Sequence, residues 1–189
     1  VDTTTGAMTY IGGSTQLNGL AYDTTTGTLY GAASYNLYTV DVNTGATTLV
    51  GGWGSSYLMI DIAIDGSGVC YGHDIITDSI YTINLGTGVA TLVGSTGLAS
   101  NYAQGMSYDL DTGTLYLAGY TSSGALYTVN TATGAATLVG AFPSGAECDG
   151  FAIPGAGGGP PKPTVFVKTG TTGAISATGF NDGTWQETS

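Results

Sequence analysis

The stretch that decides the fold is Leu37-Tyr-Thr-Val-Asp-Val-Asn-Thr-Gly-Ala-Thr-Thr-Leu-Val-Gly51. It returns with small changes at residues 80–94 and again at residues 126–140. The copies begin about 43 to 46 residues apart, which is the period of four-stranded propeller blades. The apolar runs are rich in Val, Leu, Thr and Tyr and too short for helices, so we expect an all-β propeller with almost no helix.

Each copy contains the turn motif Asp/Asn-x-x-Thr-Gly, in which the first side chain accepts backbone N–H bonds and glycine adopts a positive φ. The motif occurs six times, at Asp2–Gly6, Asp23–Gly27, Asp41–Gly45, Asn84–Gly88, Asp109–Gly113 and Asn130–Gly134. Calcium loops are disfavoured, because neither Asp41 nor Asp109 is followed by the glycine and distal glutamate of such a loop. At Ile64-Asp-Gly-Ser-Gly68 the turn is one residue shorter, which predicts a tighter hairpin.

One unit reads as four strands, with first strands recurring along the chain. The first unit has strands at 19–22, 28–31, 37–42 and 46–51, and later first strands lie at 61–64, 105–108 and 150–153. Residues Ala7–Gly12 match a fourth strand that precedes the first unit. We expect four blades, closed by strand exchange between Ala7–Gly12 and Gly150–Ile153. The alternative is a longer chain with further blades upstream.

The composition after the repeats changes at a Gly/Pro-rich segment. We predict propeller repeats over residues 1–154, a linker over 155–163 and an extended tail over 164–189. The tail is too short for a core of its own. Its candidate strands, Thr164–Lys168 and Gly173–Ala177, therefore need a partner surface. The partner is either the open blade of the same chain, a second copy of it or another surface protein.

The charge pattern excludes several classes of partner. The net charge is -11, and the two cations, Lys162 and Lys168, both lie beyond the repeats. Such a chain would repel nucleic acid and anionic membranes, and we expect it to bind neither. The apolar runs are too short to insert in a membrane. A weakly charged surface rich in hydroxyl groups indicates an extracellular or cell-surface protein.

The sequence offers little catalytic chemistry, and we expect no enzyme activity, metal or cofactor. His73 is the single histidine, and we expect it to be a plain surface-loop residue. No serine lies in a nucleophile elbow, and the histidine and cysteines have no zinc-ligand spacing. A carboxylate pair leaves a secreted glycoside hydrolase or lyase as an outside possibility. Within the repeats, the carboxylates that lie outside the hairpin turns are Asp61, Asp74, Asp78, Glu147 and Asp149.

The two cysteines, Cys70 and Cys148, allow one internal disulfide. Cys70 occupies the strand position of Leu29 and Leu115 in the sister units, which favours a small buried apolar residue instead.

Uneven loops on one face of the propeller carry aromatic rings beside amide and carboxyl groups. Such groups stack on sugars and bind their hydroxyls, so these residues are candidates for glycan binding. The candidates are Trp53, Tyr57, His73, Asp74, Asn101, Tyr102, Tyr120, Phe142 and Glu147. The competing interpretation is that the aromatic rings fill the space between blades.

The hairpin Leu37–Gly51 and its copies resemble the repeats of secreted microbial β-propellers found in poorly characterised cell-surface proteins. The resemblance covers about residues 1–154. It implies scaffolding of the kind shared by adhesins and surface-layer proteins. We therefore expect a non-enzymatic extracellular structural or adhesive surface module, which a C-terminal tail would link into a filament or coat. A glycan-binding propeller is the alternative.

Overall fold

The computed structural model describes residues 2, 4–101 and 104–153, and these residues form twelve strands and one short 3₁₀ turn. The elements are β1 (Gly19–Asp23), β2 (Thr28–Ala33), β3 (Asn36–Val40), β4 (Thr47–Gly52), β5 (Met59–Ile64), β6 (Cys70–Asp74), β7 (Ser79–Ile83), β8 (Ala90–Ser95), β9 (Gly105–Asp109), β10 (Thr114–Tyr120), β11 (Gly124–Val129), β12 (Ala136–Ala141) and η1 (Pro143–Gly145). The prediction of an all-β chain with almost no helix is confirmed.

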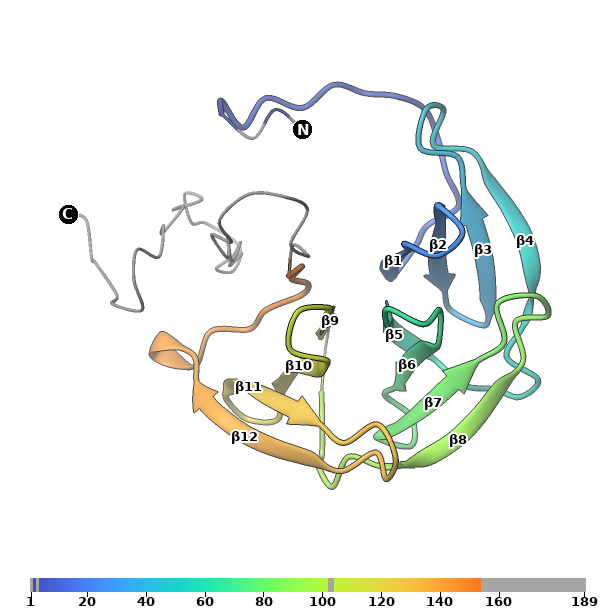
Figure 1. Cartoon of the computed structure of the whole chain (residues 1–189). Coiled ribbons are helices and arrows are strands. Elements are labelled where there is room, and N and C mark those ends of the chain that lie inside the picture. The colour runs from blue at the N-terminus through green and yellow to red at the C-terminus, as the bar shows by residue number, and fades with distance from the viewer. Residues whose placement is uncertain (1, 3, 102–103, 154–189) are drawn as a thin grey trace.

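The strands form three antiparallel sheets, each with its four strands in chain order. We call β1–β4 blade 1, β5–β8 blade 2 and β9–β12 blade 3. The blades fan out along an open arc, with β1, β5 and β9 on the inside and β4, β8 and β12 on the outside (Figure 1). This is the arrangement of a β-propeller, as predicted.

The Asp-x-x-Thr-Gly turns have the predicted chemistry. Between β3 and β4, Asp41 Oδ1 accepts the N–H groups of Asn43 at 2.8 Å and Thr44 at 3.0 Å. Gly45 has a φ of 71° and donates to the Asp41 carbonyl at 2.8 Å. The two N–H bonds lower the pKa of Asp41. The structure of each hairpin turn is therefore specified by a local run of five residues.

The shortened turn of blade 2 is tighter, as predicted. Gly68 N–H donates to the carbonyl of Asp65, three residues earlier, at 3.1 Å. In the longer turns the bond spans four residues, as from Gly27 to Asp23. Asp65 Oδ1 still accepts N–H bonds from Ser67 and Val69. The missing residue thus shortens the hairpin without removing its acidic acceptor.

Two apolar cores lie between the blades. The first joins blades 1 and 2 and contains Leu37, Trp53, Ile62 and Cys70. The second joins blades 2 and 3 and contains Ala63, Tyr71, Ile80, Met106, Leu115, Leu117 and Val129. Because side chains alternate along a strand, each strand of blade 2 contributes to both cores.

Neighbouring blades also meet through backbone at their outer ends. A Cβ at Gly51, near the end of β4, would overlap the carbonyl oxygen of Thr87 in the turn between β7 and β8. The same holds for Gly94 against Thr133 one blade later. Only glycine allows so close an approach of two backbones. The last glycine of the repeat thus serves packing between blades.

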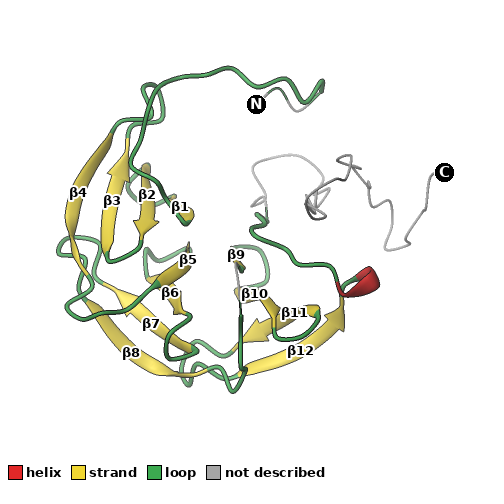
Figure 2. Ribbon diagram, turned by 180° about the vertical axis from the view of Figure 1, so that it is seen from behind, coloured by secondary structure: helices red, strands yellow, loops and turns green. Residues whose placement is uncertain are grey.

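The predicted ring closure is not formed in the described part of the chain. No sheet there joins Ala7–Gly12 to Gly150–Ile153. Figure 2 shows the opening of the arc between the N-terminal segment and η1. The proposed linker and tail, residues 155–189, lie outside the described residues. The number of blades in a complete ring, the two domain boundaries and the donated strands therefore stay predictions.

Candidate functional site

The inner strands bring four segments together around the axis of the arc. β1 contacts β5, and β5 contacts β9. Residues 150–153 lie beside β9: the Ile153 N–H donates to Ser107 Oγ at 3.0 Å, and a Cβ on Gly105 would lie 2.7 Å from Gly150 Cα. The fourth predicted first strand thus occupies the position of a first strand, although no strand is assigned there.

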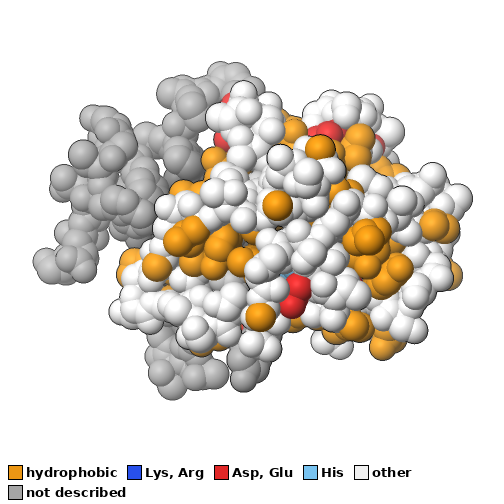
Figure 3. Space-filling model, turned by 90° about the horizontal axis from the view of Figure 1, so that it is seen from below, with side chains coloured by type: hydrophobic (Ala, Val, Ile, Leu, Met, Phe, Trp, Pro, Cys, Tyr) orange, Lys and Arg blue, Asp and Glu red, His pale blue; other side chains and the backbone are white. Residues whose placement is uncertain are grey.

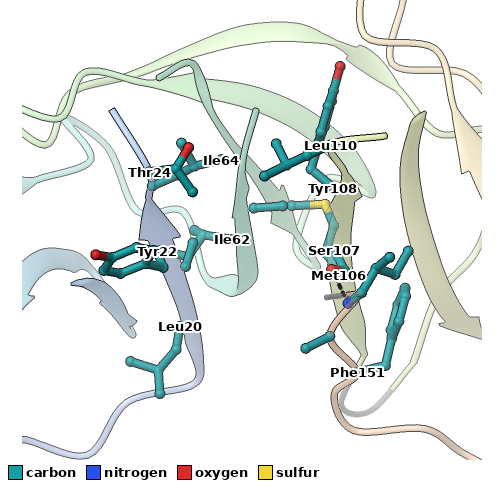
Figure 4. A pocket seen from close by; sticks show the side chains of 14 residues that line it. Leu20, Tyr22, Thr24, Ile62, Ile64, Met106, Ser107, Tyr108, Leu110 and Phe151 are labelled. Carbon is teal, nitrogen blue, oxygen red and sulfur yellow. Dashed lines mark hydrogen bonds between the residues drawn. The ribbon is translucent and has the colours of Figure 1, made fainter. Parts of the chain in front are cut away.

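A pocket of about 240 Å³ opens between these four segments. Figure 4 shows side chains of β1 on one side and Met106 of β9 with Phe151 on the other, and Ile62 and Ile64 of β5 lie between them. The lining residues are Leu20, Ala21, Tyr22, Thr24, Ile62, Ala63, Ile64, Met106, Ser107, Tyr108, Leu110, Phe151, Ala152 and Ile153. We call this space the axial pocket. Ten of its fourteen lining residues are apolar and four carry hydroxyl groups, and polar atoms supply nearly half of its exposed surface.

Tyr108 places a polar group at the wall of the axial pocket. Its hydroxyl donates to the carbonyl of Gly113 at 3.1 Å. Burial raises the pKa of Tyr108, and the nearby Asp65 carboxylate raises it further. The phenol is therefore neutral at physiological pH, and its hydroxyl is bonded to the turn between β9 and β10.

Asp61 ties the inner strands together behind the axial pocket. Its Oδ2 accepts the Met106 N–H of blade 3 at 2.6 Å, and its Oδ1 accepts the Ile62 N–H at 2.8 Å. The Leu20 N–H of blade 1 also bonds this carboxyl. Burial raises its pKa from 3.8 to about 8, so the group is mostly protonated at neutral pH. The Asp61 carboxyl thus fixes the backbone of Met106, Ile62 and Leu20, and the side chains of these three residues line the pocket.

His73 is not the surface-loop residue that the sequence predicted. It lies in β6, opposite Asp61 of β5 and Ile80 of β7, and its side chain is 0% exposed. Burial lowers its pKa from 6.5 to about 4, against the opposing effect of Asp78 and Asp74. Neither ring nitrogen has a hydrogen-bond partner. The error arose because a strand end and a loop have similar local sequences.

Trp53 and Tyr57, two of the predicted glycan-binding residues, pack within the protein. Trp53 is 1% exposed and belongs to the first core, and its Nε1 donates to the Ser34 carbonyl at 2.9 Å. Tyr57 stacks at a tilt on Tyr81, with ring centroids 4.5 Å apart. These positions fit the interpretation of aromatic rings that fill the space between blades.

Of the other predicted binding residues, Asn101 and Tyr120 lie side by side, since the Asn101 N–H donates to the Tyr120 carbonyl at 2.7 Å. Asp74 is buried and accepts N–H bonds from Leu58 at 2.6 Å and Thr77 at 3.0 Å, so it caps a turn. Asn101 is exposed, and its Nδ2 donates to the Thr121 carbonyl. The half-buried residues are Tyr120, Phe142 and Glu147, while Tyr102 lies outside the described residues. The lining of the axial pocket includes none of the nine predicted residues.

The sequence analysis missed the axial pocket, although a signal was present. Its lining comes mostly from the same segment of every unit, the predicted first strand, which is rich in apolar residues each time. That strand was treated only as part of the fold, since its side chains look like ordinary core. Only the arrangement of the blades shows that one face of this strand meets an open space.

The possible disulfide is not formed. Cys70 and Cys148 are both free thiols, and both are buried. Cys70 belongs to the core between blades 1 and 2, where burial raises the pKa of its thiol. Cys148 follows η1, and its thiol lies 3.6 Å from the Gly150 carbonyl. The prediction that Cys70 is a small buried apolar residue is therefore the correct one.

The chain matches no family model and no curated protein. It is similar in structure to a gluconolactonase from Xanthomonas campestris, with a TM-score of 0.58 and 13% identity over 89% of this chain and 60% of that one. A virginiamycin B lyase from Staphylococcus aureus has a TM-score of 0.53 and 15% identity over 74% of this chain and 45% of the lyase. The extracellular domain of a putative hybrid two-component system from Bacteroides thetaiotaomicron has a TM-score of 0.50. The identity is 14% over 89% of this chain and 22% of that one.

These neighbours share the propeller fold and overturn the prediction of a structural or adhesive surface module. That prediction treated such repeats as a mark of scaffolding. Propellers of this shape include proteins described as a gluconolactonase and a lyase, and nothing in the described residues supports a scaffold, filament or coat. At such low identity the fold alone is shared, and a role must be argued from the site.

No helix in the described part of the chain is long and apolar enough to span a membrane. Figure 3 shows one face of the molecule, on which apolar side chains are interspersed with uncharged polar surface and few carboxylates.

Proposed function

We propose that the chain binds a small apolar or aromatic molecule in the axial pocket. The observation that carries the proposal is the combination of the pocket's volume, about 240 Å³, with its apolar and aromatic lining. An apolar cavity of roughly 150 Å³ in a protein core is enough to hold benzene, and drug-sized ligands occupy pockets of about 300 Å³ or more. The axial pocket therefore fits a ligand of one or two rings.

Hydrogen-bonding groups at the wall would orient such a ligand. Tyr22, Thr24 and Tyr108 present hydroxyl groups among the apolar residues. A few polar groups within an apolar wall are the usual source of orientation in small-molecule sites. A planar ring with one hydroxyl or N–H group matches this lining.

We further propose that binding occurs without catalysis. The pocket lining contains hydroxyl groups and a thioether, but no carboxylate, imidazole, thiol or amine among its described residues. General acid–base chemistry uses histidine most often, and burial raises the pKa of the lining Tyr108 further from neutrality. Asp61 lies behind the wall, where backbone N–H groups occupy its oxygens.

An extracellular location belongs to the same proposal. It is supported by the weakly charged, hydroxyl-rich surface and by the likeness to one extracellular domain. Immunodetection in the culture medium and on washed cells of the source organism tests it, and detection only in the cell lysate would contradict it.

The methionines provide a direct test of binding. The chain has three, of which Met106 lines the axial pocket, Met59 is buried in the first core and Met8 is exposed. In a sample labelled with ¹³C at the methionine methyl groups, titration with indole should shift the Met106 signal and leave the other two in place. Glucose at the same concentration serves as the polar control.

A variant that fills the pocket sharpens this test. Ala152 lines the pocket and is exposed, so Ala152→Phe should occupy the space without disturbing a core. The indole-dependent shift of Met106 should then disappear. Equal shifts of all three methionines, or no shift with indole or cyclohexanol at millimolar concentration, would contradict binding in the pocket. Sustained hydrolysis of gluconolactone above the buffer rate, lost in Ala152→Phe, would contradict a purely binding role.

A further inference from the structure

The wall of the axial pocket is built largely from the edges of three strands. β1, β5 and β9 are each the edge strand of their sheet, on the inside of the arc (Figure 1). Three consecutive residues of each strand line the pocket, namely residues 20–22, 62–64 and 106–108. Because side chains alternate between the two faces of a strand, a wall made by one face would include only every second residue. The backbone edge of each inner strand therefore faces the pocket.

The bonds to Asp61 show which backbone groups lie on this edge. Its carboxyl accepts one N–H group from each blade, from Leu20, Ile62 and Met106. In an antiparallel pair, the N–H and C=O groups of alternate residues point to the partner strand, and those of the residues between point away from it. The N–H groups bound to Asp61 thus belong to the residues whose backbone points away from the second strand.

The next three backbone groups of this kind face the axial pocket. Tyr22, Ile64 and Tyr108 follow two residues later in the same strands, and each pairs in regular register with its second strand. By the same alternation, their N–H and C=O groups also point away from that strand. We call these groups the axial amides. Their residues line the pocket in all three blades.

The polar share of the pocket surface agrees with this geometry. Polar atoms supply nearly half of the exposed surface, although ten of the fourteen lining residues are apolar. Two of the four hydroxyl groups already have partners in the protein. Tyr108 Oη donates to the Gly113 carbonyl at 3.1 Å, and Ser107 Oγ accepts the Ile153 N–H at 3.0 Å. Such a polar share is expected where strand edges, and not only apolar side chains, form the wall.

The Asp61 carboxyl shows which chemical group fits between the inner strands. It is a planar group, 6% exposed, that N–H groups of all three blades bind. Burial raises its pKa to about 8, so it is mostly neutral at pH 7. A neutral carboxyl both accepts and donates hydrogen bonds, and a strand edge offers partners for both in its N–H and C=O groups. In a ligand at pH 7, a primary carboxamide has this shape and this neutrality.

The charges around the axial pocket also favour a neutral group. The Asp65 carboxylate lies close enough to Tyr108 to raise the pKa of that lining residue. The described lining residues include no cationic side chain. A carboxylate bound at the axial amides would therefore lose water without gaining a counter-ion, which is costly. A carboxamide avoids this cost.

We propose that the axial pocket selects a small aromatic or apolar ligand that bears a neutral carboxamide, which the axial amides of Tyr22, Ile64 and Tyr108 bind. Met106 and Phe151 would contact the apolar part of the ligand (Figure 4). This ligand class rests on the proposed function, since it presumes that the axial pocket is occupied.

Three probes of similar size test the ligand class. Benzamide, benzoate and toluene are titrated at pH 7 into the full chain labelled with ¹³C at the methionine methyl groups, and the Met106 signal gives each affinity. Two net hydrogen bonds should make benzamide bind about 10-fold or more tightly than toluene. Benzoate, which is ionised at this pH, should bind more weakly than benzamide. Toluene or benzoate binding as tightly as benzamide would overturn the carboxamide but leave the pocket occupied. No shift of Met106 with any probe, indole included, would contradict the proposed function itself.

A proline substitution tests the axial amides directly. Tyr22→Pro removes one axial N–H at a position that does not donate to the second strand, where an edge strand tolerates proline. Tyr22→Leu is the matched control, because it also lacks the ring but keeps the N–H. Benzamide should bind about 3-fold or more weakly to Tyr22→Pro than to Tyr22→Leu, whereas toluene should bind both equally.

Equal benzamide affinities of the two variants would overturn the role of the axial amides. Circular dichroism shows whether Tyr22→Pro folds. If it does not, ¹⁵N spectra of the wild type decide the question, because benzamide should shift the N–H signals of Ile64 and Tyr108 more than toluene does at equal occupancy. Equal shifts with the two probes would then overturn the proposal.

Discussion

Blade 2 and blade 3 have the same four strands and the same strand order, yet corresponding residues differ in their exposure. Ile80 of blade 2 is fully buried, whereas its counterpart Leu126 in blade 3 is half-buried. Gly94 of blade 2 packs against backbone, whereas a Cβ on Gly140 of blade 3 would meet no described residue within 4 Å. The difference comes from the neighbour, because only blade 2 is covered on both faces by described residues. A repeat of this kind forms its own hairpins but obtains its core from the next repeat.

Blade 2 also carries polar groups where its sister blades do not. Asp61 replaces the glycines found at Gly19 and Gly105, and His73 replaces Ala32 and Ala118. Both groups are at least nine-tenths buried and have shifted pKa values. The covered blade thus carries two buried titratable groups that link its stability to pH.

The largest expected effect separates the two blades at one equivalent position. Gly94→Val should lower the free energy of unfolding by about 3 kcal/mol or more, because its Cβ would overlap the Thr133 carbonyl. Gly140→Val should change the stability of a single copy by no more than about 0.5 kcal/mol. Urea unfolding of both variants at low protein concentration measures the difference. Equal losses would show that the two faces are equally packed.

Asp61→Ala should be nearly as damaging, because it removes the acceptor of three backbone N–H groups. The N–H groups of Met106, Ile62 and Leu20 would stay buried without partners, at about 3 kcal/mol in total. The control is Asp65→Ala, which removes an acceptor from the exposed turn of the same blade. A loss for Asp61→Ala no larger than for this control would contradict its role in joining the inner strands.

Asp61 should also make stability depend on pH. Its pKa rises from 3.8 to about 8 on folding, so its contribution is complete below about pH 4 and is lost as pH rises through about 8. Asp61→Asn cannot ionise and should flatten the fall in the urea midpoint between pH 4 and pH 9. An unchanged slope in this variant would place the titrating group elsewhere.

His73 should contribute a smaller change of the opposite sign. Its pKa falls from 6.5 to about 4 on folding, so its contribution is complete above about pH 6.5 and is lost as pH falls through about 4. Between pH 7 and pH 4, the free energy of unfolding of His73→Leu should therefore fall by about 3 kcal/mol less than that of the wild type. Thermal unfolding across this range checks it, and parallel curves for both proteins would refute it.

The smallest effect concerns thiol reactivity in the native state. Cys70 and Cys148 are buried free thiols whose pKa values are raised by burial, so a thiol reagent at pH 8 should label neither of them rapidly. Both should react in 6 M guanidinium chloride without a reductant. Recovery of two thiols only after reduction would indicate a disulfide.

Much of the fold was predictable because the signals are local. A turn such as Asp41–Gly45 depends on a side chain, two backbone donors and a glycine within five residues. The shorter turn at Asp65 was recognisable for the same reason. The position of His73 was not, because its local sequence resembles a loop while a strand from another part of the chain lies opposite it. The free state of the cysteines likewise depends on which core Cys70 joins.

By itself, the sequence determined the strands, the turns, the repeat and the propeller class, since each follows from contacts between residues close together in the chain. Only the tertiary structure decided which face of a strand is buried, where the axial pocket opens, which aspartate gains a raised pKa and which glycines meet backbone. These properties depend on residues tens of positions apart, such as Asp61 and Met106. Burial and electrostatics are summed over all neighbours in space, and a repeated local pattern does not specify them.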